Sequence, residues 1–175
     1  MKTTTMRISL FLLLMAGSLS ALNIQDRNLG LGIFVGGGIT HGGQAGVHGK
    51  FWSSKTDAWD AAVTWGSGNR WGSINLQADR LWNFFDLIRI SGDAGTLPLY
   101  AGVGGWLGVW ASDYWRAGVL ETETKFGLGA RFPLGFSYLA KQAPLEGFLE
   151  VAPGLALFPS AVFTFDIMLG GHFYF

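Results

Sequence analysis

The chain of 175 residues carries twelve basic and twelve acidic residues, is 49% hydrophobic and 14% charged, and contains 27 glycines and no cysteine. Its charged share lies well below the roughly one quarter of an average soluble domain, and its balanced charge offers no basic surface for nucleic acid. Without cysteine, disulfides, thiolate metal sites and a lipoprotein anchor are excluded.

The chain begins "MKTTTMRISLFLLLMAGSLSALNIQ", in which a basic start is followed by a short apolar run and then by small residues. This order is typical of a secretory signal peptide, and the run is too short to remain as a membrane anchor. We expect a signal peptide over residues 1–21, cleaved after Ser20 or Ala21, and a single domain over residues 22–175.

Beyond this leader no uninterrupted apolar run approaches the ~20 residues that a membrane helix requires. Instead, extended stretches of about ten residues alternate with clusters of turn-forming residues. The expected strands are Leu29 to Gly37, Gln44 to Trp52, Ala58 to Trp65, Ser73 to Phe84, Leu97 to Trp110, Phe126 to Leu139, Leu145 to Leu157 and Val162 to Phe175.

Within these stretches the large apolar residues recur at every second position, so that they share one face of a strand. In the last stretch, "AVFTFDIMLGGHFYF", the apolar face holds Phe163, Phe165, Ile167, Leu169, Phe173 and Phe175. The other face of the strands is built from glycine, alanine and serine with a few charges, which suits a narrow packed lumen. Arg80 is an exception on the apolar side, and we expect it to snorkel to an interface.

Alternation alone fits either a soluble barrel with an apolar filling or a membrane barrel with an apolar coat. Trp59, Trp65, Trp82 and Phe175 fall at strand ends, where membrane barrels carry aromatic girdles. Hydrocarbon offers no partner for an unpaired strand edge, so such a sheet must close. The sequence therefore predicts an all-β fold, an eight-stranded antiparallel up-and-down transmembrane β-barrel.

An even strand number puts both ends of the chain on the periplasmic side. The expected periplasmic turns are Ser53 to Asp57, Phe85 to Thr96 and Ala140 to Pro144. The expected outer loops are Thr40 to Gly43, Ser67 to Gly72, Ala111 to Lys125 and Phe158 to Ala161, of which only the third is long.

The segments "KFWSSKTDAWDAAVTW", "LPLYAGVGG", "ARFPLGFSYLAKQAPLEGFLEVAPGLALFP" and "HFYF" resemble a family of small bacterial outer-membrane barrels similar to the OmpA transmembrane domain and to OmpX. The resemblance covers nearly all of the mature chain. It implies insertion by the outer-membrane barrel assembly machinery, with Phe173 and Phe175 as the assembly signal. A basic residue commonly follows the two glycines of the fifth strand in this family, where this chain has Trp106. The resemblance implies no catalytic residues.

A ring of eight strands is just wide enough to be filled by its own side chains. Buried charges must be paired, because an unpaired one costs several kcal/mol. We therefore expect a lumen charge network with more acids than bases, formed by Lys50, Asp60, Asp79, Arg131, Glu146, Glu150 and Asp166, with His48 and His172 on the same face. The alternative is a narrow, low-conductance ion path that opens when the pairs exchange partners.

A lipid-modifying enzyme is the weaker alternative. Glu146 and Glu150 lie four residues apart along one strand, roughly 13 Å, which is too far for a paired acid and base. An esterase-like site would need His41 beside Ser53 or Ser54, but the expected turns put the histidine and the two serines at opposite membrane faces. The histidines show no metal-ligand spacing, so we expect no metal site. The glycine-rich stretches are not followed by a helix, as a dinucleotide-binding loop would be, so we expect no cofactor and no enzyme.

The long loop "ASDYWRAGVLETETK" is the main candidate for recognition. Tyr114, Trp115 and Arg116 are residue types that anchor protein interfaces, although the two aromatics would also suit the outer girdle. The predicted function is that of a structural or surface-interaction protein of the bacterial outer membrane. Its expected partners are outer-membrane lipid, the assembly machinery and an extracellular protein ligand.

Overall fold

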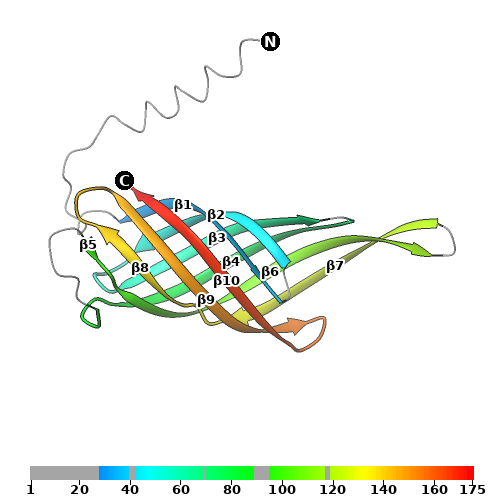
Figure 1. Ribbon diagram of the computed structural model, residues 1–175. Coiled ribbons are helices and arrows are strands. Elements are labelled where there is room, and N and C mark those ends of the chain that lie inside the picture. Colours follow the sequence, from blue (N-terminus) through cyan, green and yellow to red (C-terminus); the bar gives the residue numbers. More distant parts are fainter. Residues whose placement is uncertain (1–27, 40–41, 69, 89–94, 117–118) are drawn as a thin grey trace, which may run out of the picture.

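In the computed structural model the chain forms a closed barrel of eight antiparallel strands, two of which are divided into two segments (Figure 1). The structure describes residues 28–39, 42–68, 70–88, 95–116 and 119–175. The strands are β1 Leu29–Gly38, β2 Gly42–Trp52, β3 Asp57–Gly68, β4 Trp71–Phe84, β5 Gly95–Thr96, β6 Leu99–Arg116, β7 Val119–Arg131, β8 Leu134–Ala140, β9 Leu145–Phe158 and β10 Val162–Tyr174. The expected signal peptide lies outside the described residues. Within them, no helix has the length and hydropathy needed to cross a membrane.

Pairing of the first and last long strands closes the ring. β10 pairs with β1 from Gly30↔Tyr174 to Gly38↔Asp166, and with β9 on its other side. Every pairing in the described chain is antiparallel between neighbours in the ring. The predicted fold class is therefore confirmed.

Proline divides one of the eight predicted strands and shortens another at its start. The stretch expected from Phe126 to Leu139 is divided into β7 and β8 around Pro133, and β5 is separated from β6 at Pro98. Proline has no amide hydrogen and cannot donate to a ladder. The segments before and after Pro133 nevertheless stay aligned, because the carbonyl of Pro133 accepts a hydrogen bond from the amide of Gly102 at 2.8 Å.

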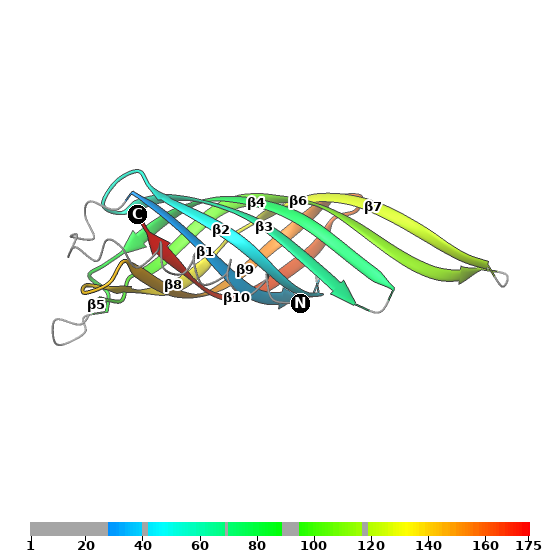
Figure 2. The ribbon, with the colours of Figure 1, turned by 90° about the horizontal axis from the view of Figure 1, so that it is seen from above.

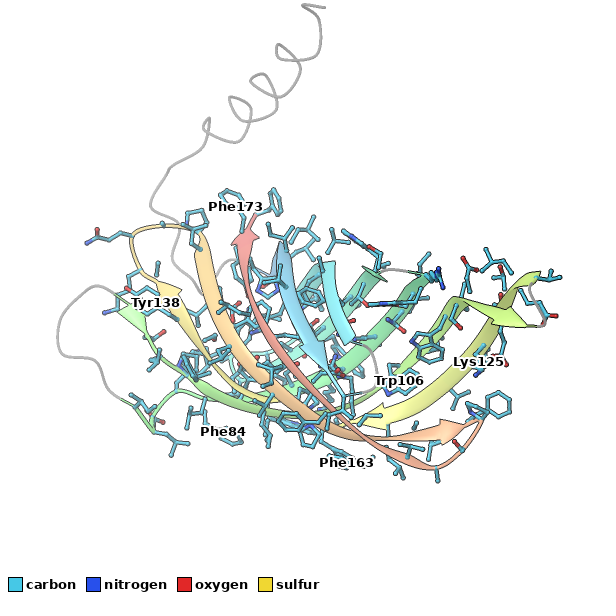
Figure 3. All side chains as sticks on the ribbon, turned by 45° about the vertical axis from the view of Figure 1, so that its right-hand side comes forward. Phe84, Trp106, Lys125, Tyr138, Phe163 and Phe173 are labelled. Carbon is cyan, nitrogen blue, oxygen red and sulfur yellow. The ribbon has the colours of Figure 1, made fainter. Side chains whose placement is uncertain are left out.

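The apolar faces point outward, as expected for a membrane barrel. Exposed side chains include Trp59, Val63 and Trp65 on β3, Phe132, Leu134 and Phe136 around β8, and Phe163, Ile167 and Leu169 on β10. The alternate positions between them on β3 and β10 are buried. Figure 3 labels Phe163 and Phe173 near the two ends of β10. An exposed hydrophobic surface of this extent is typical of a protein that contacts a membrane or another protein.

Arg80 is placed as expected. It lies on the outer face, where its guanidinium is 3.2 Å from a carboxylate oxygen of Asp57 at the start of β3. The same group lies 5.9 Å from the ring of Trp59 and 5.5 Å from that of Trp82. A cation among tryptophans at a strand end is the arrangement of an interfacial girdle.

The third outer loop differs from its prediction. Residues expected as a loop from Ala111 to Lys125 instead continue both strands, so that β6 extends to Arg116 and β7 begins at Val119. We call residues 113–127 the β6–β7 hairpin. Beyond Ser112, which faces Trp71, β6 has no register partner on β4, and β7 pairs with β9 only from Leu128 onward. The hairpin therefore extends past its neighbours, as Figure 2 shows.

Candidate functional site: the lumen and the protruding hairpin

The first lumen cluster surrounds Lys50, and we call it the Lys50 cluster. Lys50 is 2% exposed, and its Nζ lies 2.7 Å from Oε1 of Glu146. Tyr174 donates a hydrogen bond from its hydroxyl to the other oxygen of Glu146, and Trp52 donates from Nε1 to the Tyr174 hydroxyl at 3.0 Å. The Lys50 ammonium also lies 4.6 Å from the centre of the Trp52 ring. These contacts join β2, β9 and β10 through side chains.

The second cluster surrounds Arg131, and we call it the Arg131 cluster. Nη1 of Arg131 donates to Gln77 at 2.5 Å and to Asp79 at 2.9 Å, while Nη2 donates to Glu150 at 2.6 Å. Tyr100 donates from its hydroxyl to the second oxygen of Glu150 at 3.0 Å. The fixed fork of a guanidinium suits such a multiple contact. One buried cation thus connects side chains from β4, β7 and β9.

The third cluster is formed by His48, Asp60 and His172, and we call it the histidine cluster. His48 Nε2 lies 2.8 Å from Oδ1 of Asp60. The rings of His48 and His172 are stacked with centroids 4.2 Å apart. Phe148 packs against both rings, at 5.0 and 5.3 Å. His48 and His172, which show no metal-ligand spacing in the sequence, are therefore brought together by the fold.

The remaining predicted lumen residue, Asp166, is buried on β10 opposite Gly38. All seven side chains of the predicted network are thus buried on the inner face. Glu146 and Glu150 share that face but contact different cations, so they do not act as a carboxylate pair.

Some partners were missed from the sequence. Gln77 and Tyr100 are hydrogen-bonded to charged groups of the Arg131 cluster. Their position on the inner face was available from strand parity, but parity does not give the distances across the lumen. Trp106, which stands where the resemblance implies a basic residue, is also buried and packs edge-on to Trp110, with 5.8 Å between centroids.

Glycines make room for these large inner side chains at specific places. A Cβ on Gly129 would lie 2.8 Å from the Trp106 ring, and one on Gly135 would lie 2.5 Å from the ring of Tyr100. Both distances are shorter than van der Waals contact. The small residues of the inner face therefore complement its bulky ones.

The predicted recognition residues lie at the tip of β6. In the register, Tyr114 is opposite Glu121, Trp115 is opposite Leu120, and Arg116 is opposite Val119. The side chains of Tyr114, Trp115 and Arg116 lie outside the described part of the structure, as does His41. Across the hairpin, Thr122 donates a hydrogen bond to Asp113 at 2.7 Å. Lys125, labelled in Figure 3, lies 3.1 Å from Glu123.

In the turn that precedes β3, Ser53 and Ser54 both hydrogen-bond to Asp57. The Ser54 hydroxyl donates to Asp57 at 2.8 Å, and together with Arg80 it lowers the pKa of Asp57 below its ordinary value. These serines therefore have a local role in the turn between β2 and β3.

Comparison with known proteins identifies the fold. The barrel resembles the N-terminal β-barrel domain of OprF from Pseudomonas aeruginosa, with a TM-score of 0.59, 12% identity, and coverage of 85% of this chain and 98% of that chain. It also resembles Neisserial surface protein A, with a TM-score of 0.57, 10% identity, and coverage of 84% and 96%.

A third structure, Ail of Yersinia pestis in complex with the heparin analogue sucrose octasulfate, gives a TM-score of 0.49 at 9% identity, with coverage of 85% and 97%. No family model matches the chain, and no curated protein matches it in sequence. The fold is thus that of the small, eight-stranded, OmpA-like outer-membrane barrels.

Proposed function

We propose that this chain is a non-catalytic barrel protein of the bacterial outer membrane that presents the β6–β7 hairpin to an extracellular protein ligand. One contrast supports this proposal. Ion pairs buried in the lumen connect distant strands, whereas the hairpin projects beyond its neighbours. A filled lumen leaves little room for a substrate or an aqueous channel, so surface recognition is the activity best matched to this shape.

The hairpin has the chemistry of a recognition element. Tyr114, Trp115 and Arg116 are clustered at its tip, and these residue types supply much of the binding energy in protein interfaces. Val119 and Leu120 are exposed on the opposing strand. An exposed apolar pair beside interface-forming residue types favours binding to another protein.

A shortened hairpin tests this role. Replacing residues 113–122 by Asn-Gly would join Ser112 to Glu123, which already face each other, through a two-residue turn. Cells that display either form would be compared for adhesion to immobilised fibronectin, laminin and collagen. We expect the shortened barrel to keep its heat-modifiable migration on a gel but to lose adhesion. Adhesion that is unchanged by the replacement, or absent from the complete protein on all three surfaces, would refute the proposal.

Protease treatment of intact cells tests the orientation. A glutamate-specific protease should cut after Glu121 or Glu123 in the hairpin and spare the barrel. A hairpin that is spared in intact cells but cut after these glutamates once the outer membrane is permeabilised would lie on the periplasmic side and contradict surface presentation.

The ion-path alternative rests on the Arg131 cluster, because one cation there faces two carboxylates that it could exchange. Recording in planar lipid bilayers separates the two functions. We expect no reproducible openings from the complete barrel. Steady openings whose conductance changes in Arg131→Ala would favour the ion path instead.

We also propose that the chain is exported through a cleaved signal peptide and inserted by the barrel assembly machinery. Phe173 and Phe175 end the chain on its outer face. Removing residues 173–175 should abolish the heat-modifiable species in cells. A truncated protein that reaches the outer membrane at the normal level would show that these aromatics are not the assembly signal.

A further inference from the structure

Within the barrel, the strand register brings two histidines together. Gly32 on β1 faces His48 on β2 on one side and His172 on β10 on the other. A Cβ on Gly32 would lie 2.0 Å from the carbonyl oxygen of Gly171 and 3.0 Å from the His172 ring. The absence of a side chain at this position therefore permits the two imidazoles to stack across β1.

Asp60 completes a set of three potential ligands. One ligand atom from each of His48, Asp60 and His172 lies within 4.8 Å of the others. The 2.8 Å between His48 Nε2 and Asp60 Oδ1 is already close to the separation of two atoms bound to one metal at about 2.0–2.1 Å. A modest rotation of the imidazole of His172 would bring the third atom into range.

His172 itself is buried with an unused nitrogen. Its side chain is 1% exposed, and neither Nδ1 nor Nε2 makes a hydrogen bond in the described chain. Nδ1 lies 3.3 Å from Oε2 of Glu146. A metal-binding histidine ordinarily directs its second nitrogen to a carboxylate, which fixes the tautomer and the ring orientation. Glu146 is placed to serve His172 in this way.

The charge of the inner face also favours a cation. Five buried carboxylates, from Asp60, Asp79, Glu146, Glu150 and Asp166, accompany two buried cations, Lys50 and Arg131, in the described chain. The Lys50 and Arg131 clusters engage Glu146, Asp79 and Glu150. Asp60, by contrast, has His48 as its recorded partner. A bound divalent cation would offset negative charge at this position.

We propose that His48, Asp60 and His172 form a three-ligand site for a divalent transition metal inside the barrel. Two imidazoles and one carboxylate suit Zn²⁺ or Cu²⁺ and do not suit Mg²⁺ or Ca²⁺, which prefer oxygen ligands. Phe34 and Phe148 lie against the rings and limit the access of water to the site. The proposal depends on the lumen alone and is independent of ligand binding by the hairpin.

The first test uses Cu²⁺ and the complete mature barrel in detergent. The protein is folded with CuCl₂, treated briefly with EDTA to remove metal from the surface, and passed through a desalting column. We expect about one retained copper per chain, with an electron paramagnetic resonance spectrum that shows hyperfine coupling to two nitrogen atoms. No retained copper, or a spectrum without nitrogen coupling, would overturn the proposal.

Variants then identify the ligands by Zn²⁺ titration calorimetry. His48→Gln and His172→Gln should each lower the affinity by at least about 100-fold, and each should leave a single coupled nitrogen in the copper spectrum. Asp166→Asn is the matched control, because it removes a buried carboxylate from the same strand as His172 but from outside the ligand set. Its affinity should remain within about threefold of the unmodified barrel.

Equal affinity in His172→Gln and in the unmodified barrel would overturn the proposed ligand set. If a histidine variant fails to show heat-modifiable migration, the copper spectrum of the unmodified barrel decides the question alone. Two coupled nitrogens would support the site, and none would refute it.

Discussion

Removal of the Arg131 guanidinium tests the energetic role of the lumen network most directly. In Arg131→Met the side-chain stem stays, but Asp79 and Glu150 lose their cation inside the barrel. Breaking a buried ion pair by removing one partner typically costs about 3–5 kcal/mol, because the other charge stays buried without compensation. We expect a loss of unfolding free energy of that size.

The assay is urea unfolding of the barrel in detergent micelles, followed by tryptophan fluorescence. With a denaturant slope of about 2 kcal/mol per molar urea, the loss corresponds to a midpoint lower by about 1.5–2.5 M. Arg80→Met is the matched control, since it removes the same group from a pair whose arginine side chain is 48% exposed. Its midpoint should move far less, because water screens an exposed pair.

A triple variant separates lost pairing from lost packing. Arg131→Met combined with Asp79→Asn and Glu150→Gln removes the two stranded charges together with their cation. It should recover most of the stability lost in the single variant, since neutral amides are much easier to bury than unpaired carboxylates. A midpoint shift in Arg131→Met no larger than in Arg80→Met, or no recovery in the triple variant, would refute the reasoning.

Two further predictions concern the turn and the close packing of the inner face. Hydrogen bonds from Ser54 and, to a smaller extent, from Arg80 lower the pKa of Asp57. The folded turn therefore gains stability from this carboxylate above pH 3.8, its ordinary pKa, and loses that stability as the pH falls through the lowered pKa. An NMR titration of the Asp57 carboxyl should show this lower midpoint, and a midpoint at or above 3.8 would contradict it. Gly129→Ala should lower the unfolding free energy by about 1–3 kcal/mol, since its Cβ would lie 2.4 Å from a backbone carbonyl oxygen. Gly147→Ala, whose Cβ would have no neighbour within 4 Å, is the control in the same urea assay, and equal losses in the two variants would contradict the packing argument.

The β6–β7 hairpin shows where the sequence pattern fails. Alternation identifies a strand because one face touches lipid and the other faces the lumen. Past the membrane both faces meet water, so polar side chains such as Glu121, Thr122 and Glu123 follow one another and the period of two disappears. The chain still pairs with itself there, and the predicted loop is a continuation of both strands.

Strand parity in the sequence determined which side chains share a face, and only together with the aromatic strand ends and the small residues of the other face did it predict a closed eight-stranded barrel with its apolar face outward. The reason is that lipid imposes the same apolar coat on every strand. Tertiary structure decided which inner groups meet. Lys50 and Glu146 are 96 residues apart, and His48 and His172 come together because Gly32 lies between them in the register. Such contacts depend on the stagger between strands and on distances across the ring, and neither quantity is encoded in the alternation of any single strand.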